Sequence, residues 1–418
     1  MRNNYIKKTL SNGVKLYLYI DKNMKQYYVD YMVNYGSLGI WYDFYLDDNH
    51  YHVLPGCAHF LEHLLEEHSK YGNFFKYLAT KKYTRNATTS DKITRFFFRG
   101  TKDIYDSIEK LINVVDDPVF TKEDIEETKF AIAEETKRFR NNKNSLLYCI
   151  TQKNLFKDLD LYSDTNCIIG DENTTYQIDY DMLKACYDAF YYDENKTLLI
   201  AGNFDEKEIT DYLENIYSKL KPHKKRVKEY TYNNLDKVKK KYDTFNFATN
   251  SDEIGIIFKE FNTNYSNKEI FYYLHFIKDS LLLNGTDFIE DLKKKNILEN
   301  IDIFDIQFIY DDLFTFQIHA SVKDSKKFEN ELISKLKKPN FNEKDFKLYI
   351  KSEISKHALK IDYKYDEFQT FFTRKETSDD FDDINFIKTL SFDKFINFYN
   401  SLNFDDYVVC IINDKNKS

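Results

Sequence analysis

The pentapeptide His59-Phe60-Leu61-Glu62-His63 has the residue types and the spacing of a metal site. Residues four apart on a helix lie on one face, with Cβ atoms about 5–6 Å apart, so the two imidazoles can share one Zn²⁺. Glu62 projects from the same face and can take a proton from a water whose pKa the metal lowers. The spacing therefore predicts metal-dependent hydrolysis, with two ligands on one helix.

A catalytic zinc needs a third protein ligand and one open position, so another element must contribute. The segment 122–140 predicts a helix with five glutamates: Glu123, Glu126, Glu127, Glu134 and Glu135. Glu127 and Glu134 are two turns apart on one face, but spacing alone does not choose among the five. Without a third ligand, the pentapeptide is a helix with two half-buried histidines and a solvated glutamate.

The helix of the pentapeptide is expected to follow a set of strands. Asn12-Gly13 predicts a hairpin between two strand-like runs, and a third strand-like run covers 26–33. An aromatic loop continues through Tyr51. Pro55-Gly56 then precedes a helix predicted over 57–69, which presents both histidines.

Further elements are expected in both halves of the chain. Residues 86–98 predict one strand, and Thr121 with Asp124 resembles a capping box that begins the helix 122–140. The remaining expected elements are helices at 181–191, 207–220 and 268–282, and strands at 197–201, 254–258, 303–310, 314–320 and 407–412. The order of elements repeats between the halves, which predicts an internal duplication.

The length of 418 residues exceeds one ordinary core, so two domains are expected. Between 221 and 243 the chain is basic and polar, with little apolar periodicity. We therefore predict a catalytic zinc-binding domain over 1–222, a linker over 223–242 and a related non-catalytic domain over 243–418.

The composition limits the cellular location and the classes of binding partner that we expect. The net charge is −8 with mixed signs and no basic stripe, which argues against nucleic acid. The chain has no apolar run of ~18 residues for a membrane span, and its start has no secretory signal pattern. Five dispersed cysteines without CxxC spacing predict reduced thiols, a cytoplasmic location and no thiolate zinc site. They are Cys57, Cys149, Cys167, Cys186 and Cys410.

The order H-x-x-E-H is the inverzincin signature, and the flanking residues extend the resemblance. Residues 56–63 are similar to the G-x-A-H-x-L-E-H core of the family of pitrilysin, insulin-degrading enzyme and mitochondrial processing peptidase. Further segments resemble landmarks of that family: the N-A-x-T strand at Asn86–Thr89, Asp117–Phe120, Glu127-x6-Glu134, Ile169-Gly170 and Gly202–Asp205. The resemblance covers nearly the whole chain and is closest over 1–220.

The resemblance implies roles for individual residues, and zinc as the cofactor. It assigns zinc ligands to His59, His63 and Glu134, the general base to Glu62, and an accessory role to Glu127. The interval between His63 and Glu134 is several residues shorter than is usual in the family, so Glu135 is the alternative ligand.

The resemblance also implies a fold and a way of holding the substrate. The expected fold is α+β, with two related domains. Each is an antiparallel-rich sheet with helices packed on one face, and together they form half of a clam-shell chamber. Asn86 and Ala87 would lie on an edge strand that pairs with an extended peptide backbone.

The family stabilises the oxyanion with an Arg and a Tyr from the start of an inert half. The equivalent stretch here, Asn246–Phe261, contains neither residue type. The second half has no H-x-x-E-H, and His275, His319 and His357 are expected to be structural. We therefore predict a heterodimer with a related chain that supplies the Arg/Tyr pair.

The expected function is a zinc-dependent metalloendopeptidase that hydrolyses unfolded peptides, either in precursor or leader-peptide processing or in peptide degradation. The missing Arg/Tyr pair favours one alternative, a non-catalytic or weakly active scaffold subunit of a heterodimeric peptidase. A two-domain α+β protein without a metal is the third possibility.

Overall fold

The computed structural model describes residues 5–101, 104–140, 142–161, 168–249, 251–261, 264–360, 368 and 383–414. The chain divides into two compact units. Unit 1 comprises Met1–Asn142 and Leu161–Tyr232, and unit 2 comprises Lys143–Asp160 and Asn233–Ser418. The chain therefore passes from one unit to the other three times, instead of once within the predicted linker 223–242.

Unit 1 is built on a six-stranded sheet. Its order is β1 (Tyr5–Thr9), β2 (Lys15–Ile20), β8 (Lys196–Gly202), β3 (Tyr27–Val33), β7 (Thr94–Gly100) and β6 (Thr84–Thr89). Only β2 and β8 pair in parallel; the other neighbours are antiparallel. A small second sheet has the order β5 (Asn49–His52), β4 (Asp43–Leu46) and β9 (Val227–Glu229).

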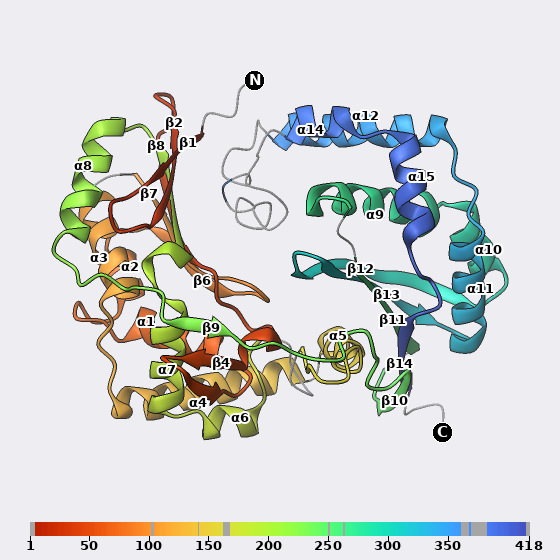
Figure 1. The fold of residues 1–418 in the computed structure, drawn as a ribbon, viewed down its shortest axis with the longest axis horizontal. Coiled ribbons are helices and arrows are strands. Elements are labelled where there is room, and N and C mark those ends of the chain that lie inside the picture. Colours follow the sequence, from red (N-terminus) through yellow and green to blue (C-terminus); the bar gives the residue numbers. More distant parts are fainter. Residues whose placement is uncertain are drawn as a thin grey trace. The chain divides into compact units, whose positions relative to one another are not determined.

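Figure 1 shows the helices of unit 1 gathered on one side of the six-stranded sheet. Alternate residues of a strand point to opposite faces, so Val29, Tyr31 and Val33 of β3 enter one core with the helices. The helices are α1 (Cys57–Glu67), α2 (Phe74–Thr80), α3 (Ile104–Asp116), α4 (Lys122–Arg140), α6 (Glu172–Gln177), α7 (Tyr180–Phe190) and α8 (Glu206–Tyr217), with short 3-10 turns at Gly39–Trp41 and Asp193–Asn195.

Unit 2 repeats this plan with a five-stranded sheet. Its order is β10 (Tyr242–Phe247), β14 (Tyr407–Asp414), β11 (Asp252–Phe261), β13 (Leu313–Val322) and β12 (Leu298–Tyr310). Only β10 and β14 pair in parallel. Its helices are α5 (Lys143–Lys153), α9 (Asn267–Leu281), α10 (Asp287–Lys294), α11 (Ser325–Lys337), α12 (Glu343–Lys360), α14 (Asp383–Thr389) and α15 (Phe392–Ser401).

Five of the six strands of unit 1 correspond in chain order to the five strands of unit 2, and β1 has no counterpart. β2, β3, β6, β7 and β8 of unit 1 match β10, β11, β12, β13 and β14 of unit 2, with the same neighbours and the same parallel pair. Helix α9 follows the second strand of its set, as α1 does in unit 1. This correspondence supports the predicted duplication and confirms the α+β class with antiparallel-rich sheets.

Helix α5 belongs to unit 2 because it packs on the sheet face opposite the other helices. In β14, Val409 lies in the core shared with those helices, whereas its neighbour Cys410 and Ile412 pack on Leu147 and Ile150 of α5. The sequence predicted helices on one face only. The second covered face explains why 143–160 separates from the rest of the predicted domain 1–222.

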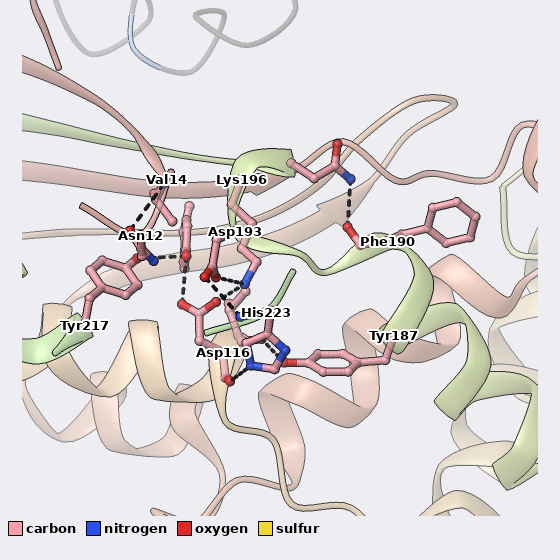
Figure 2. A network of polar contacts seen from close by, with 12 residues as sticks. Asn12, Val14, Asp116, Tyr187, Phe190, Asp193, Lys196, Tyr217 and His223 are labelled. Atoms are coloured by element: carbon pink, nitrogen blue, oxygen red, sulfur yellow. Dashed lines mark hydrogen bonds and ion pairs between the residues drawn. The ribbon is translucent and has the colours of Figure 1, made fainter. Parts of the chain in front are cut away.

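A buried ion-pair network connects the end of α3 to the start of β8 (Figure 2). Lys196 is fully buried and pairs with Asp116 and, at 3.3 Å, with Asp193. Nε2 of His223 lies 2.8 Å from the Asp116 carbonyl oxygen, and the Asp116 carboxylate accepts a hydrogen bond from Tyr31. Compensation by two carboxylates allows a lysine to stay inside the core.

Most predicted elements are present, and one strand prediction is wrong. The segment 86–98 is two strands, β6 and β7, because Ser90–Ile93 forms a turn closed by a hydrogen bond from Ser90 N to Ile93 O at 2.8 Å. The aromatic loop through Tyr51 contains the strands β4 and β5.

The cysteines differ in part from the expected reduced set. Cys57, Cys186 and Cys410 are buried free thiols, whereas Cys149 is disulfide-bonded, so the prediction is wrong for Cys149. Cys167 lies outside the described residues. Within the described ranges, no helix combines the length and the apolar character that a membrane span requires.

Candidate metal centre

The start of α1 is set by two glycines that let backbone segments touch. Gly56 caps the helix with φ 99°, and a Cβ there would lie 2.7 Å from the Ile169 carbonyl oxygen. Gly170 has φ 74°, and its Cβ would lie 2.5 Å from the Pro55 carbonyl oxygen. Only glycine suits both the left-handed backbone and this close approach, so the two turns fix where α1 begins.

His59 and His63 lie next to each other on the inner face of α1. Their ring centroids are 4.7 Å apart with an interplanar angle of 69°. His59 is buried and His63 is partly exposed. The Nδ1 atoms of both rings are buried without a hydrogen-bond partner among the described residues, and the Nε2 atoms face α4.

The third member of the group is Glu135 of α4. Its Oε2 lies 3.7 Å from Nε2 of His59 and 3.5 Å from Nε2 of His63. Glu134 instead points outward, pairing at 2.8 Å with Lys137, which also reaches Glu172. The structure thus brings Glu135, the alternative ligand of the sequence analysis, to the two histidines, and it turns Glu134 away from them.

Glu127 also lies apart from the two histidines. It is exposed, and one of its carboxylate oxygens forms a group with His68 and Asp124, whose closest ligand atoms lie within 4.8 Å of one another. The predicted accessory role beside His59 and His63 is therefore not supported by its position. The predicted capping box is present, since Asp124 N donates to Thr121 Oγ1 at 3.2 Å and Thr121 N donates to the Asp124 carboxylate at 2.7 Å.

The group of His59, His63 and Glu135 fits a zinc ion. Zn²⁺ binds His nitrogen and carboxylate oxygen at about 2.0–2.2 Å, which places tetrahedral ligand atoms about 3.3–3.6 Å from each other. The separation of 3.5 Å lies within this range, and the separation of 3.7 Å lies just above it. They are long for direct hydrogen bonds and leave room for a cation shared by the three side chains.

Burial controls protonation in the group. Burial, with the charge of His63 beside it, lowers the pKa of His59 to about 3, so this imidazole is neutral at neutral pH. Burial opposes the charge on His63, but Glu135, Glu62 and Glu66 together raise its pKa. The contact with His63 lowers the pKa of Glu135 and keeps this carboxylate ionised.

Glu62 of α1 is buried against β6 of the sheet. Burial raises its pKa to about 7, although hydrogen bonding by Thr89 and the charge of His63 act in the opposite direction. Thr89 Oγ1 donates to Oε2 of Glu62 at 2.6 Å. A carboxylate with a pKa near neutrality suits a general base.

Sequence reasoning missed the contact made by Thr89. The N-A-x-T motif contains this threonine and was the available signal, but the motif was interpreted only as a backbone-pairing strand. The carboxyl group of Glu66 was missed as well; burial raises its pKa to about 8.

Asn86 and Ala87 lie on β6, the edge strand of the unit 1 sheet. β6 pairs with β7 on one side, and its other side ends the sheet. β6 also contacts α1. An extended peptide added to this edge would therefore run beside the helix that carries the three motif residues.

Comparisons with known proteins agree with this geometry. The domain described as Insulinase (Peptidase family M16) matches residues 47–161, and the Peptidase M16 inactive domain matches residues 177–352. A curated relative, the uncharacterized zinc protease YmfH of Bacillus subtilis, is 31% identical over 200 residues. That alignment covers 48% of this chain and 46% of the relative, so it spans about half of each protein.

Solved structures share the fold at low sequence identity. An M16-like peptidase from Alicyclobacillus acidocaldarius is 20% identical, with a TM-score of 0.85 and 99% coverage of both chains. A protease from Helicobacter pylori is 16% identical, with a TM-score of 0.77, covering 98% of this chain and 99% of that one. Pitrilysin is 15% identical, with a TM-score of 0.68, over 99% of this chain and 45% of its own.

Proposed function

From the premise that this chain belongs to the M16 peptidase family, we propose that it is a zinc-dependent endopeptidase acting on unfolded peptides. The observation that carries the proposal is the convergence of His59, His63 and Glu135 at the separations of zinc ligands, with Glu62 beside them. His59, His63 and Glu135 would hold the ion. When bound, zinc supplies a Lewis acid that polarises a carbonyl and acidifies a water.

The chain's own residues would supply the proton transfer and the binding of the peptide. Glu62 accepts the proton of the attacking water and returns it to the leaving amine, as its near-neutral pKa allows. The β6 edge, through Asn86 and Ala87, holds the peptide extended by backbone pairing. Backbone pairing requires an unfolded segment, so the substrate class is an extended peptide, such as a precursor, a leader or a degradation product.

The test measures zinc and peptide cleavage on the same preparation. The purified chain should bind one zinc and cleave an unstructured fluorogenic peptide, and Glu62→Gln should retain the zinc while losing cleavage by about 100-fold or more. A chain that binds no zinc, or a Glu62→Gln variant with full activity, would contradict the proposal. Lys137→Gln, which changes an exposed residue of α4, serves as the control.

A second candidate is a weakly active or non-catalytic subunit of a heterodimeric peptidase. One observation favours it: Asn246–Phe261, which includes β11, contains neither Arg nor Tyr. A related partner chain would then supply the oxyanion-stabilising pair. Zinc binding without cleavage by the isolated chain, and cleavage when the partner is added, would support this form of the function.

A further inference from the structure

The Glu62 carboxylate meets a hydroxyl at the end of a strand. Thr89 Oγ1 donates to Oε2 of Glu62 at 2.6 Å, and both side chains are buried. Thr89 is the last residue of β6, immediately before the tight turn into β7. The register pairs Thr89 directly with Thr94, so a hydrogen-bonded hairpin holds the hydroxyl in place.

A count of the protons gives the direction of this hydrogen bond. Thr94 Oγ1 donates to the Tyr35 carbonyl oxygen at 2.9 Å and lies 3.3 Å from Thr89 Oγ1. A hydroxyl has one proton to donate, and the proton of Thr94 is used by Tyr35. The proton of Thr89 goes to Glu62, because the carboxylate is both the closer and the stronger acceptor.

From this arrangement we propose that Thr89 is a positioning residue that orients the Glu62 carboxylate for proton transfer. The terminal torsion of a glutamate is broad, with no sharp preference of its own. The Thr89 hydroxyl fixes one carboxylate oxygen, and the Thr89 backbone N–H adds a second contact that favours the ionised carboxylate. A carboxylate held in this way would present a defined lone pair to the proton of the attacking water. The role of Thr89 rests on the proposed function, and it links the base to the strand that would hold the peptide.

The experiment compares Thr89→Ala, Thr89→Ser and the control Thr80→Ala, which removes an exposed threonine hydroxyl at the end of α2. Zinc content, kcat and KM are measured on the full chain, together with its partner if cleavage requires one. Thr89→Ala should keep the zinc and a KM within about twofold while kcat falls by about 10–100-fold, as for other residues that orient catalytic groups. Thr89→Ser should restore kcat to within a few fold of wild type.

An unchanged kcat in Thr89→Ala, or no rescue by serine, would overturn the proposal. Structures of wild type and Thr89→Ala decide the question independently of activity. A rotated Glu62 carboxylate in the alanine variant supports the positioning role, and an unmoved carboxylate rejects it. If the wild type is inactive but the Glu62 carboxylate still rotates in Thr89→Ala, the peptidase function is contradicted and the orienting contact is established.

Discussion

Two adjacent glutamates of α4 differ completely in their surroundings. Each residue of a helix turns it by about 100°, so Glu135 lies about 60° from Ile132 around the axis and Glu134 about 160° away. Ile125 and Ile132 are buried and mark the inner stripe. The apolar stripe was therefore readable from the sequence and would have selected Glu135, whereas the seven-residue spacing of two glutamates could not show which face they occupy.

This difference gives a matched pair of substitutions. Glu135→Gln should lower zinc affinity by at least about 10-fold, because it replaces a charged ligand, whereas Glu134→Gln should leave the affinity unchanged. Competition with a chromogenic chelator measures both. Equal effects of the two substitutions would contradict the ligand assignment.

His319 of β13 predicts a pH dependence of stability away from the metal centre. Burial lowers its pKa to about 3, from an ordinary value of 6.5. Between these values the unfolded chain binds a proton that the folded chain excludes. The contribution of His319 to the free energy of unfolding is therefore fully present above pH 6.5. It falls as the pH decreases, by up to about 1.4 kcal/mol per pH unit.

The measurement is the thermal unfolding midpoint of wild type and His319→Gln between pH 7.5 and pH 4.5. The midpoint of the wild type should fall more steeply with decreasing pH. Parallel curves for the two proteins would show that His319 does not titrate in this way.

At the scale of elements, the sequence predicted the hairpin at Asn12-Gly13 and the helix α4, but it missed the helices α2, α3, α5 and α6 and the turn between β6 and β7. The helix 122–140 was predicted closely, because its capping box and its charged surface are local signals. The strand predicted over 86–98 hid a turn at Ser90–Ile93, because threonine and phenylalanine on both sides favour strands and the turn has no glycine or proline. Local sequence could not show that the turn brings Thr89 back beside Thr94.

The contact between Gly56 and Gly170 predicts a specific loss of stability. Gly56→Ala would add left-handed strain and a clash with the Ile169 carbonyl oxygen. Gly72→Ala adds only the strain, because Gly72 has φ 75° and no atom within 4 Å of its added Cβ. We expect about 1 kcal/mol of destabilisation at Gly72 and about 2–4 kcal/mol at Gly56.

The free energy of unfolding of each glycine variant is measured by chemical denaturation. The difference between the two variants separates the cost of backbone strain from the cost of the clash with Ile169. Because Gly56 begins α1, its variant should also bind zinc more weakly. Similar losses of stability at both positions would mean that the packing of the two turns contributes little.

At the scale of the whole molecule, the duplication does not extend to the histidine pair of α1. Helix α9 of unit 2 has the chain position of α1, but it carries a single histidine, His275, whose Nδ1 lies 2.8 Å from the Phe271 carbonyl oxygen. The repeated order of elements was visible in the sequence. The shared pairing of five strands in each sheet was not, because register depends on contacts between distant segments.

The missing Arg/Tyr pair predicts a dependence on a second chain. Loss of one oxyanion donor costs about 10²–10³ in kcat, so the isolated chain should cleave peptides at least about 100-fold more slowly than its mixture with a related chain that carries the pair. Cleavage assays with and without the partner measure this ratio. Full activity of the isolated chain would exclude the requirement.

The chain crosses between the two units three times, and this limits where it can be cut into separate fragments. A gene split within 223–242 would not give one fragment per unit, because the first fragment would still contain α5, whose Leu147 and Ile150 are buried against β14. The two fragments would hold each other through α5 and could be purified as a pair. Expressed alone, the first fragment would expose those apolar side chains to solvent as a hydrophobic patch that promotes aggregation.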